Sequence, residues 1–134
     1  MPTLPLTLTR RSLLRGAAAC GALPFLPAAA AQALDFTLTP RRASAPLAGT
    51  RYPPTAVWAY NGTVPGPEIR ARQGERIRIK VENALEVDTT LHCHGIRLPN
   101  AMDGVPHLTQ APIQPGTAFT YEFDLPDAGT YWYH

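Results

Sequence analysis

Alternation of apolar and polar residues is the clearest pattern along the chain, and it predicts β-strands. Residues 77–82 read IRIKVE and residues 118–125 read AFTYEFDL. Side chains two positions apart lie on the same face of a strand, so each segment has one apolar and one polar face. Further short candidates occupy residues 35–39, 55–60, 89–95 and 130–134. No segment keeps a helical period, so we expect an all-β protein with half-buried strands.

Turn-forming residues separate the predicted strands. The connecting segments are rich in Pro, Gly, Asn and Asp, as in NGTVPGP, LPNAMDGVP and PDAG. Several short strands joined in this way favour a Greek-key β-sandwich or barrel. Residues 41–54 are expected to form an irregular arm ahead of this barrel. The chain stops at His134 inside an aromatic strand, so we expect a fragment that is incomplete at its C-terminus.

The first 33 residues have the composition of an export signal. Paired arginines precede an uncharged stretch rich in Ala and Leu, and a small-residue triplet, AQA, ends the segment. The stretch TRRSLLR resembles a twin-arginine signal, which implies the twin-arginine export machinery, a bacterial periplasm and a mature chain from Leu34. A membrane anchor is the weaker alternative, because Pro24 and Pro27 interrupt the uncharged stretch. Lipid attachment at Cys20 is weaker still.

Charge and cysteine content narrow the possible partners. Three of the 12 basic residues lie in the export signal, which leaves nine against 10 acidic residues, so no nucleic-acid partner is expected. The chain has 2 cysteines, and the export signal contains Cys20. Cys93 therefore has no partner for an internal disulfide in an oxidising compartment.

The motif LHCHG at residues 91–95 carries the candidate metal ligands. On a strand, His92 and His94 point to one face with Cα atoms about 6.6 Å apart. This spacing serves one small ion poorly, whereas two neighbouring ions could each take one imidazole. Cys93 points to the other face with Leu91 and Thr89, so we expect it to pack in the core as a small apolar residue.

A mononuclear blue-copper site is the alternative for a cysteine among histidines. Such a site needs one Cys, two His and usually a weak Met ligand around one ion. Met102 and His107 do follow Cys93. However, His94 faces away from Cys93 on a strand, and Leu98 stands where a further histidine would be needed. The sequence therefore argues against this site. His107 is expected to be a loop residue, or a residue that contacts the metal ligands without binding the metal.

His134 is a candidate third ligand. It ends the segment TYWYH and, by alternation, shares a face with Trp132 and Thr130. Alone it would be read as a structural or exposed histidine. Beside the strand that carries His92 and His94, it becomes a plausible member of the same site.

Three segments together resemble one protein family. In chain order they read YNGTVPGPEIRARQGERIRIKVEN, TTLHCHGIRLPNAMDGVPHLTQAPIQPG and GTYWYH, and they resemble the first cupredoxin domain of a multicopper oxidase. The resemblance covers residues 58–134 and implies a truncated plastocyanin-like (cupredoxin) domain there. Residues 34–57 would then form an N-terminal strand and the irregular arm.

The resemblance implies a trinuclear copper cluster to which this domain contributes part of the histidines. His92 would bind the type 2 copper, and His94 and His134 would bind one type 3 copper. The type 1 copper would lie in the missing part of the protein. By the same resemblance, Asp103 would help to deliver protons. Without the resemblance, Asp103 would be interpreted as a loop residue that begins a turn before Gly104.

The activity implied by the family is one-electron oxidation of a small-molecule or metal-ion reductant, coupled to reduction of dioxygen to water. The fragment alone is expected to be inactive. Cys93 departs from the family pattern, in which an aromatic residue is most common between the two histidines. Two other functions stay open: an exported copper-binding module, and a multicopper-oxidase-like scaffold without oxidase activity, against which the intact histidines argue.

Overall fold

The computed structural model describes residues 32–134. The predicted export signal, apart from its last two residues, lies outside this range. Within the described range, no helix is long and apolar enough to cross a membrane.

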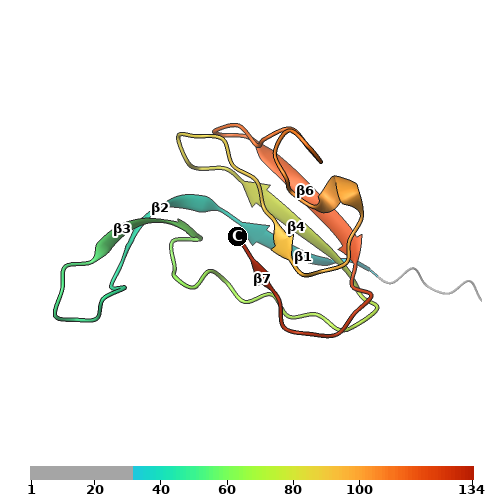
Figure 1. Ribbon diagram of the computed structural model, residues 1–134, viewed down its shortest axis with the longest axis horizontal. Helices are drawn as coiled ribbons and strands as arrows, with labels where there is room; N and C mark the ends of the chain where they lie inside the picture. The colour runs from blue at the N-terminus through green and yellow to red at the C-terminus, as the bar shows by residue number, and fades with distance from the viewer. Residues whose placement is uncertain (1–31) are drawn as a thin grey trace, which may run out of the picture. The chain divides into compact units, whose positions relative to one another are not determined.

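A three-stranded sheet forms the centre of the structure (Figure 1). Its middle strand, β4 (Arg76–Glu82), pairs in parallel with β1 (Leu34–Leu38) and antiparallel with β6 (Ala118–Asp124). Two of these strands are the segments in which alternation is most regular. The two clearest strand predictions are therefore confirmed.

Two smaller sheets complete the described part of the chain. In the first, β2 (Pro40–Ala45) pairs antiparallel with β3 (Thr55–Tyr60). In the second, β5 (Cys93–His94) pairs antiparallel with β7 (Trp132–Tyr133). Among the described residues, the one helical segment is a 3-10 turn, η2 (Asn100–Met102). The all-β prediction is confirmed, and the sheets do not close into a barrel.

The structure corrects the prediction of an irregular arm at residues 41–54. Residues 40–45 form strand β2, because their backbone groups pair with β3 from Pro40 opposite Tyr60 to Ala45 opposite Thr55. Only the connection between β2 and β3 is irregular. The expected strand at residues 89–95 is also shorter than predicted: Thr89 makes a single bridge to Ile113, and regular pairing is confined to β5.

The apolar side chains of β4 and β6 lie side by side on one face of the central sheet and form much of the core. Ile77, Ile79 and Val81 are buried, as alternation predicts, and so are Tyr121 and Phe123 of β6. Burial of one such side chain contributes about 1.5–3 kcal/mol. Other members of the same cluster come from outside the central sheet and include Leu91, Cys93 and Ile113. The core therefore fixes the segment that carries His92 and His94.

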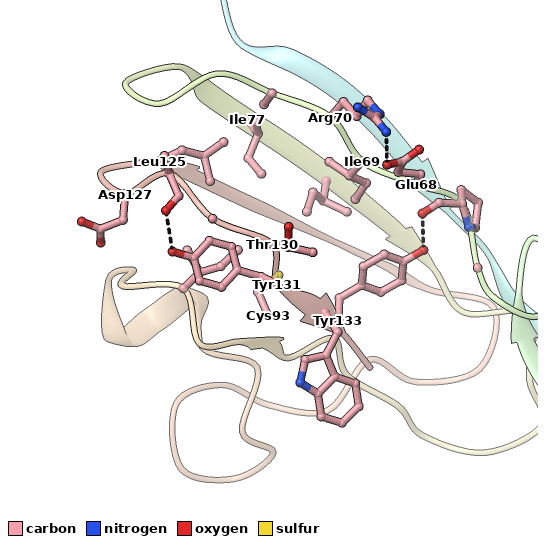
Figure 2. A pocket seen from close by; sticks show the side chains of 18 of the residues that line it. Glu68, Ile69, Arg70, Ile77, Cys93, Leu125, Asp127, Thr130, Tyr131 and Tyr133 are labelled. Atoms are coloured by element: carbon pink, nitrogen blue, oxygen red, sulfur yellow. Dashed lines mark hydrogen bonds and ion pairs between the residues drawn. The ribbon is translucent and has the colours of Figure 1, made fainter.

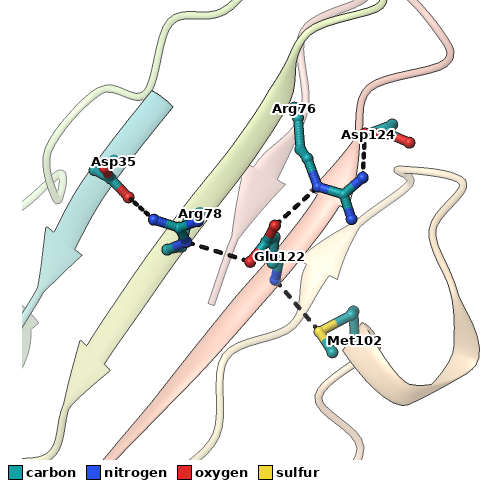
Figure 3. Close-up of polar contacts among 6 residues, drawn as sticks. All are labelled: Asp35, Arg76, Arg78, Met102, Glu122 and Asp124. Carbon is teal, nitrogen blue, oxygen red and sulfur yellow. Dashed lines mark hydrogen bonds and ion pairs between the residues drawn. The ribbon is translucent and has the colours of Figure 1, made fainter. Parts of the chain in front are cut away.

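Ion pairs cover the opposite face of the central sheet (Figure 3). Arg78 of β4 lies between Asp35 of β1 and Glu122 of β6, and Arg76 contacts both Glu122 and Asp124. Hydrogen bonds from the two arginines lower the pKa of Glu122. Because these side chains are exposed to solvent and salt, the ion pairs contribute little to the stability of the fold.

The Tyr121 hydroxyl joins the central sheet to the segment before His92. It accepts a hydrogen bond of 3.0 Å from the backbone N–H of Leu91. Both residues are fully buried, so this N–H has no access to water. The bond therefore holds Leu91 in place on the sheet that carries Tyr121.

Tyr121→Phe is expected to lower the free energy of unfolding by about 1–3 kcal/mol, because it leaves the buried N–H of Leu91 unpaired. Tyr52→Phe is the matched control, since Tyr52 is exposed, and it should change the free energy by less than about 0.5 kcal/mol. Chemical unfolding of the complete gene product measures both. Equal midpoints for the two variants would contradict this role of the Tyr121 hydroxyl.

Candidate metal centre

The β5–β7 ladder brings His92 and His134 opposite each other. The backbone N–H of His92 donates to the carbonyl of His134 over 2.8 Å, and that of His134 donates back over 3.0 Å. Within the ladder, Cys93 then pairs with Tyr133 and His94 with Trp132. Because faces alternate along each strand, His92, His94, Trp132 and His134 share one face.

The three imidazoles on this face converge. One nitrogen from each of His92, His94 and His134 lies within 4.8 Å of the others. Their ring centroids are 5.3 to 5.8 Å apart. His92 is half-buried, whereas His94 and His134 are exposed. The structure thus brings together the three histidines that the sequence nominates as metal ligands.

The Trp132 indole stacks on two of these rings. Its centroid is 5.0 Å from that of His94 and 4.3 Å from that of His134, and both ring pairs are nearly parallel at 27°. Stacking of this kind restricts the rotation of both imidazoles. Alternation placed Trp132 on the ligand face, but a role for its ring was not predicted.

A backbone carbonyl determines which nitrogen of His92 is free. The Nδ1 atom of His92 lies 2.7 Å from the carbonyl oxygen of Asp103. A carbonyl oxygen only accepts hydrogen bonds, so Nδ1 must carry the proton and Nε2 keeps its lone pair in the neutral ring. The Asp103 carboxylate is close as well, with Oδ1 3.4 Å from Nδ1. Sequence reasoning missed the carbonyl contact, because every residue type has this group.

The donor set fits copper. Neutral imidazole nitrogens suit copper, zinc, iron and nickel, and the lone pair on Nε2 of His92 is available for such a bond. Two nitrogens bound to one ion lie at most about 4 Å apart, given bonds of about 2 Å. Three nitrogens within 4.8 Å of one another are therefore compatible with one ion or with neighbouring ions.

Cys93 lies on the other face of the ladder, as predicted. Its side chain is 3% exposed and packs in the core cluster. Burial, and to a lesser extent the charge of Asp103, raises the pKa of its thiol to about 11. A metal-binding cysteine must be a thiolate, so this environment suits a core residue rather than a ligand.

A cavity lies on the Cys93 side of the ladder (Figure 2), and none of the three histidines lines it. It measures about 740 Å³, and Cys93, Tyr133 and the apolar residues Ile77 and Ile79 help to line it. The Tyr133 hydroxyl donates to the carbonyl of Pro67 over 2.7 Å at its edge.

The two other candidates for a blue-copper site are not part of the cluster. His107 is exposed in the loop after Asp103 and is not among the three converging histidines. The sulfur of Met102 accepts a hydrogen bond from the backbone N–H of Glu122 over 3.4 Å, as Figure 3 shows. Both observations agree with the argument against a mononuclear site.

Sequence comparisons identify relatives of the chain. The family model described as multicopper oxidase matches residues 43–134. Copper resistance protein A of Pseudomonas syringae pv. tomato is 36% identical over 140 residues, which cover 94% of this chain and 22% of that protein. Multicopper oxidase MmcO of Mycobacterium tuberculosis is 48% identical over 98 residues, which cover 73% and 19%. The chain spans about a fifth of the length of these relatives.

Solved structures with the same fold include a blue copper oxidase. The match to Lac15 from a marine microbial metagenome has a TM-score of 0.71 and 42% identity, and it covers 74% of this chain and 26% of that chain. The blue copper oxidase from Nitrosomonas europaea has a TM-score of 0.71 and 37% identity, covering 77% and 32%. These likenesses confirm the predicted cupredoxin-like fold.

The environment of Cys93 predicts a slow reaction with thiol reagents. A rise of the pKa to about 11 leaves about 100-fold less thiolate at pH 8 than an ordinary cysteine has. Iodoacetamide should therefore modify the tryptic peptide 81–97 slowly in the folded complete gene product and rapidly in guanidinium. Mass spectrometry of this peptide measures both rates, and equal rates would contradict the burial of Cys93.

Proposed function

The chain belongs to the multicopper oxidase family, and we propose that it supplies part of a trinuclear copper cluster to an oxidase. The complete protein would couple one-electron oxidation of a reducing substrate to the four-electron reduction of dioxygen to water. The observation that carries this proposal is the convergence of His92, His94 and His134 on one face of the β5–β7 ladder. Family membership alone would not require these three side chains to meet.

Each histidine has a proposed role in holding copper. His92 binds the type 2 copper through Nε2, since Nδ1 is engaged by the Asp103 carbonyl. His94 and His134, whose rings both stack on Trp132, bind a type 3 copper. When bound by imidazole, copper supplies one-electron chemistry because it cycles between two oxidation states.

Asp103 is proposed to deliver protons to the centre. Its carboxylate lies 3.4 Å from Nδ1 of His92, and about a third of its side chain is exposed (34%). A carboxylate that contacts both a ligand and the solvent can exchange a proton with water beside the site where dioxygen is reduced. Its backbone carbonyl has a different task, which is to hold His92.

The cellular setting is part of the proposal. The twin-arginine-like segment at residues 1–33 would direct export to a bacterial periplasm, without a stable membrane anchor. Relatives named laccase or copper resistance protein are compatible with a small-molecule or a metal-ion reductant. The type 1 copper that receives the electrons would lie outside this chain.

A copper-binding module without oxidase activity is the second candidate. The three histidine nitrogens, all within 4.8 Å of one another, also suit a single ion. Such a module would bind copper through the same residues but would not consume dioxygen. The copper content of the protein and its oxygen uptake therefore distinguish the two functions.

His134→Ala is expected to abolish oxidase activity in the complete gene product loaded with copper. Loss of a residue that hydrogen-bonds to a metal ligand typically lowers metal affinity or activity about 10–100-fold. Loss of the ligand itself should therefore lower the activity at least about 100-fold. Oxygen uptake with a phenol or with ferrous or cuprous ion measures the activity, and elemental analysis measures copper. His107→Ala is the matched control and should keep both.

Three outcomes are informative here. Undiminished uptake in His134→Ala would remove His134 from the centre. Copper binding without oxygen uptake in the wild-type protein, whatever the reductant, would favour the copper-binding module. Absence of both would support the scaffold without oxidase activity.

Asp103→Asn is expected to lower the turnover number by about 100-fold, in line with the usual contribution of general acid catalysis. Copper content should stay the same, because Asn provides the same backbone carbonyl to His92. Steady-state oxygen uptake and elemental analysis test the two expectations separately. A turnover number equal to that of the wild-type protein would restrict Asp103 to a structural role in the turn.

A further inference from the structure

The corner at Asp103–Gly104 lies directly against the strand segment that leads into His92. Gly104 is buried and has a φ of +78°. A Cβ atom at this position would overlap the carbonyl oxygen of Leu91 and would lie 2.6 Å from its carbonyl carbon and 3.1 Å from the nitrogen of His92. Both the backbone conformation and the lack of space therefore require glycine.

The corner is held by hydrogen bonds within its own loop, whereas Leu91 is held by the central sheet. On one side, the N–H of Asp103 donates to the carbonyl of Asn100 over 3.2 Å. On the other side, the N–H of Val105 donates to the Thr109 hydroxyl over 2.9 Å. Leu91 in turn is held by the Tyr121 hydroxyl. A side chain at Gly104 would therefore displace the corner from Leu91 rather than displace Leu91.

The peptide bond between Asp103 and Gly104 links this close contact to the metal centre. The carbonyl group of that peptide is the one that lies 2.7 Å from Nδ1 of His92. Any outward shift of Gly104 moves this carbonyl as well, since the peptide unit is rigid and planar. The distance between Gly104 and Leu91 thus controls the hydrogen bond to His92.

We infer that Gly104 is a positioning residue for the metal centre. Its missing side chain lets the Asp103 carbonyl hold His92 in the tautomer that has a proton on Nδ1 and a free lone pair on Nε2. The consequence for copper rests on the proposed function, whereas the consequence for the tautomer does not. Gly104 itself touches neither the metal nor the reacting atoms.

The tautomer of His92 can be measured in the metal-free wild-type protein. We expect nitrogen NMR of the complete gene product, labelled with ¹⁵N at histidine, to show Nδ1 of His92 protonated and Nε2 unprotonated. A free histidine in water prefers the opposite tautomer, so the result is diagnostic. A proton on Nε2 would overturn the inference, and this test requires no variant to fold.

Gly104→Ala tests the steric part of the inference. We expect copper affinity at the type 2 site to fall about 10–100-fold, as is usual when a partner of a ligand is lost. Titration against a copper chelator measures the affinity, and the type 2 signal in electron paramagnetic resonance identifies the site. The absorption band of the type 1 copper should keep its strength, because that copper lies elsewhere.

Gly116→Ala is the matched control. Gly116 has a similar φ of +74°, but nothing lies within 4 Å of the position of a Cβ. This variant should suffer the same backbone strain and keep the affinity of the wild-type protein. Equal affinities for Gly104→Ala and Gly116→Ala would overturn the inference.

Failure of the proposed function is a separate outcome. If the wild-type protein binds no copper but His92 is protonated at Nδ1, the proposed function is wrong and Gly104 still positions His92. If copper binds to a wild-type protein whose His92 is protonated at Nε2, the function stands and the role of Gly104 is wrong.

Discussion

His92 and His134 exchange both of their backbone hydrogen bonds across the β5–β7 ladder, and the geometry of the site depends on this pairing. It joins residues 42 positions apart in the sequence and sets the register of both strands. A slip by one residue would turn either set of side chains to the other face. In the observed register, three imidazoles face one another and the thiol of Cys93 faces the core.

The two faces of the short β5–β7 ladder have different surroundings: one packs against the core, and the other carries the three histidines. Leu91 and Cys93 pack among the side chains of the central sheet, while His92 and His94 alternate with them on the exposed side. The Tyr121 hydroxyl and the Asp103–Gly104 corner hold the same segment from two further directions. The histidines are thus attached to a rigid support, as a site requires if it is to hold metal ions at fixed separations.

The alternation of apolar and polar residues along the strands made much of this structure predictable from the sequence. It identified the buried faces of β4 and β6 and placed Cys93 opposite the histidines, but it did not show that His134 lies beside them. It did not reveal β2, whose sequence PRRASA has little strand preference and forms a strand through pairing with β3. The parallel pairing of β1 with β4 and the carbonyl contact to His92 were also missed, because long-range backbone pairing leaves no local sequence signal.

We propose that His92, His94 and His134 together bind copper. Anomalous diffraction at the copper absorption edge, from crystals of the complete gene product, tests it most directly. We expect copper peaks about 2 Å from a nitrogen of each of the three histidines, and none at the sulfur of Cys93. Absence of copper from this face of the ladder, or a copper ion bound by Cys93, would contradict it.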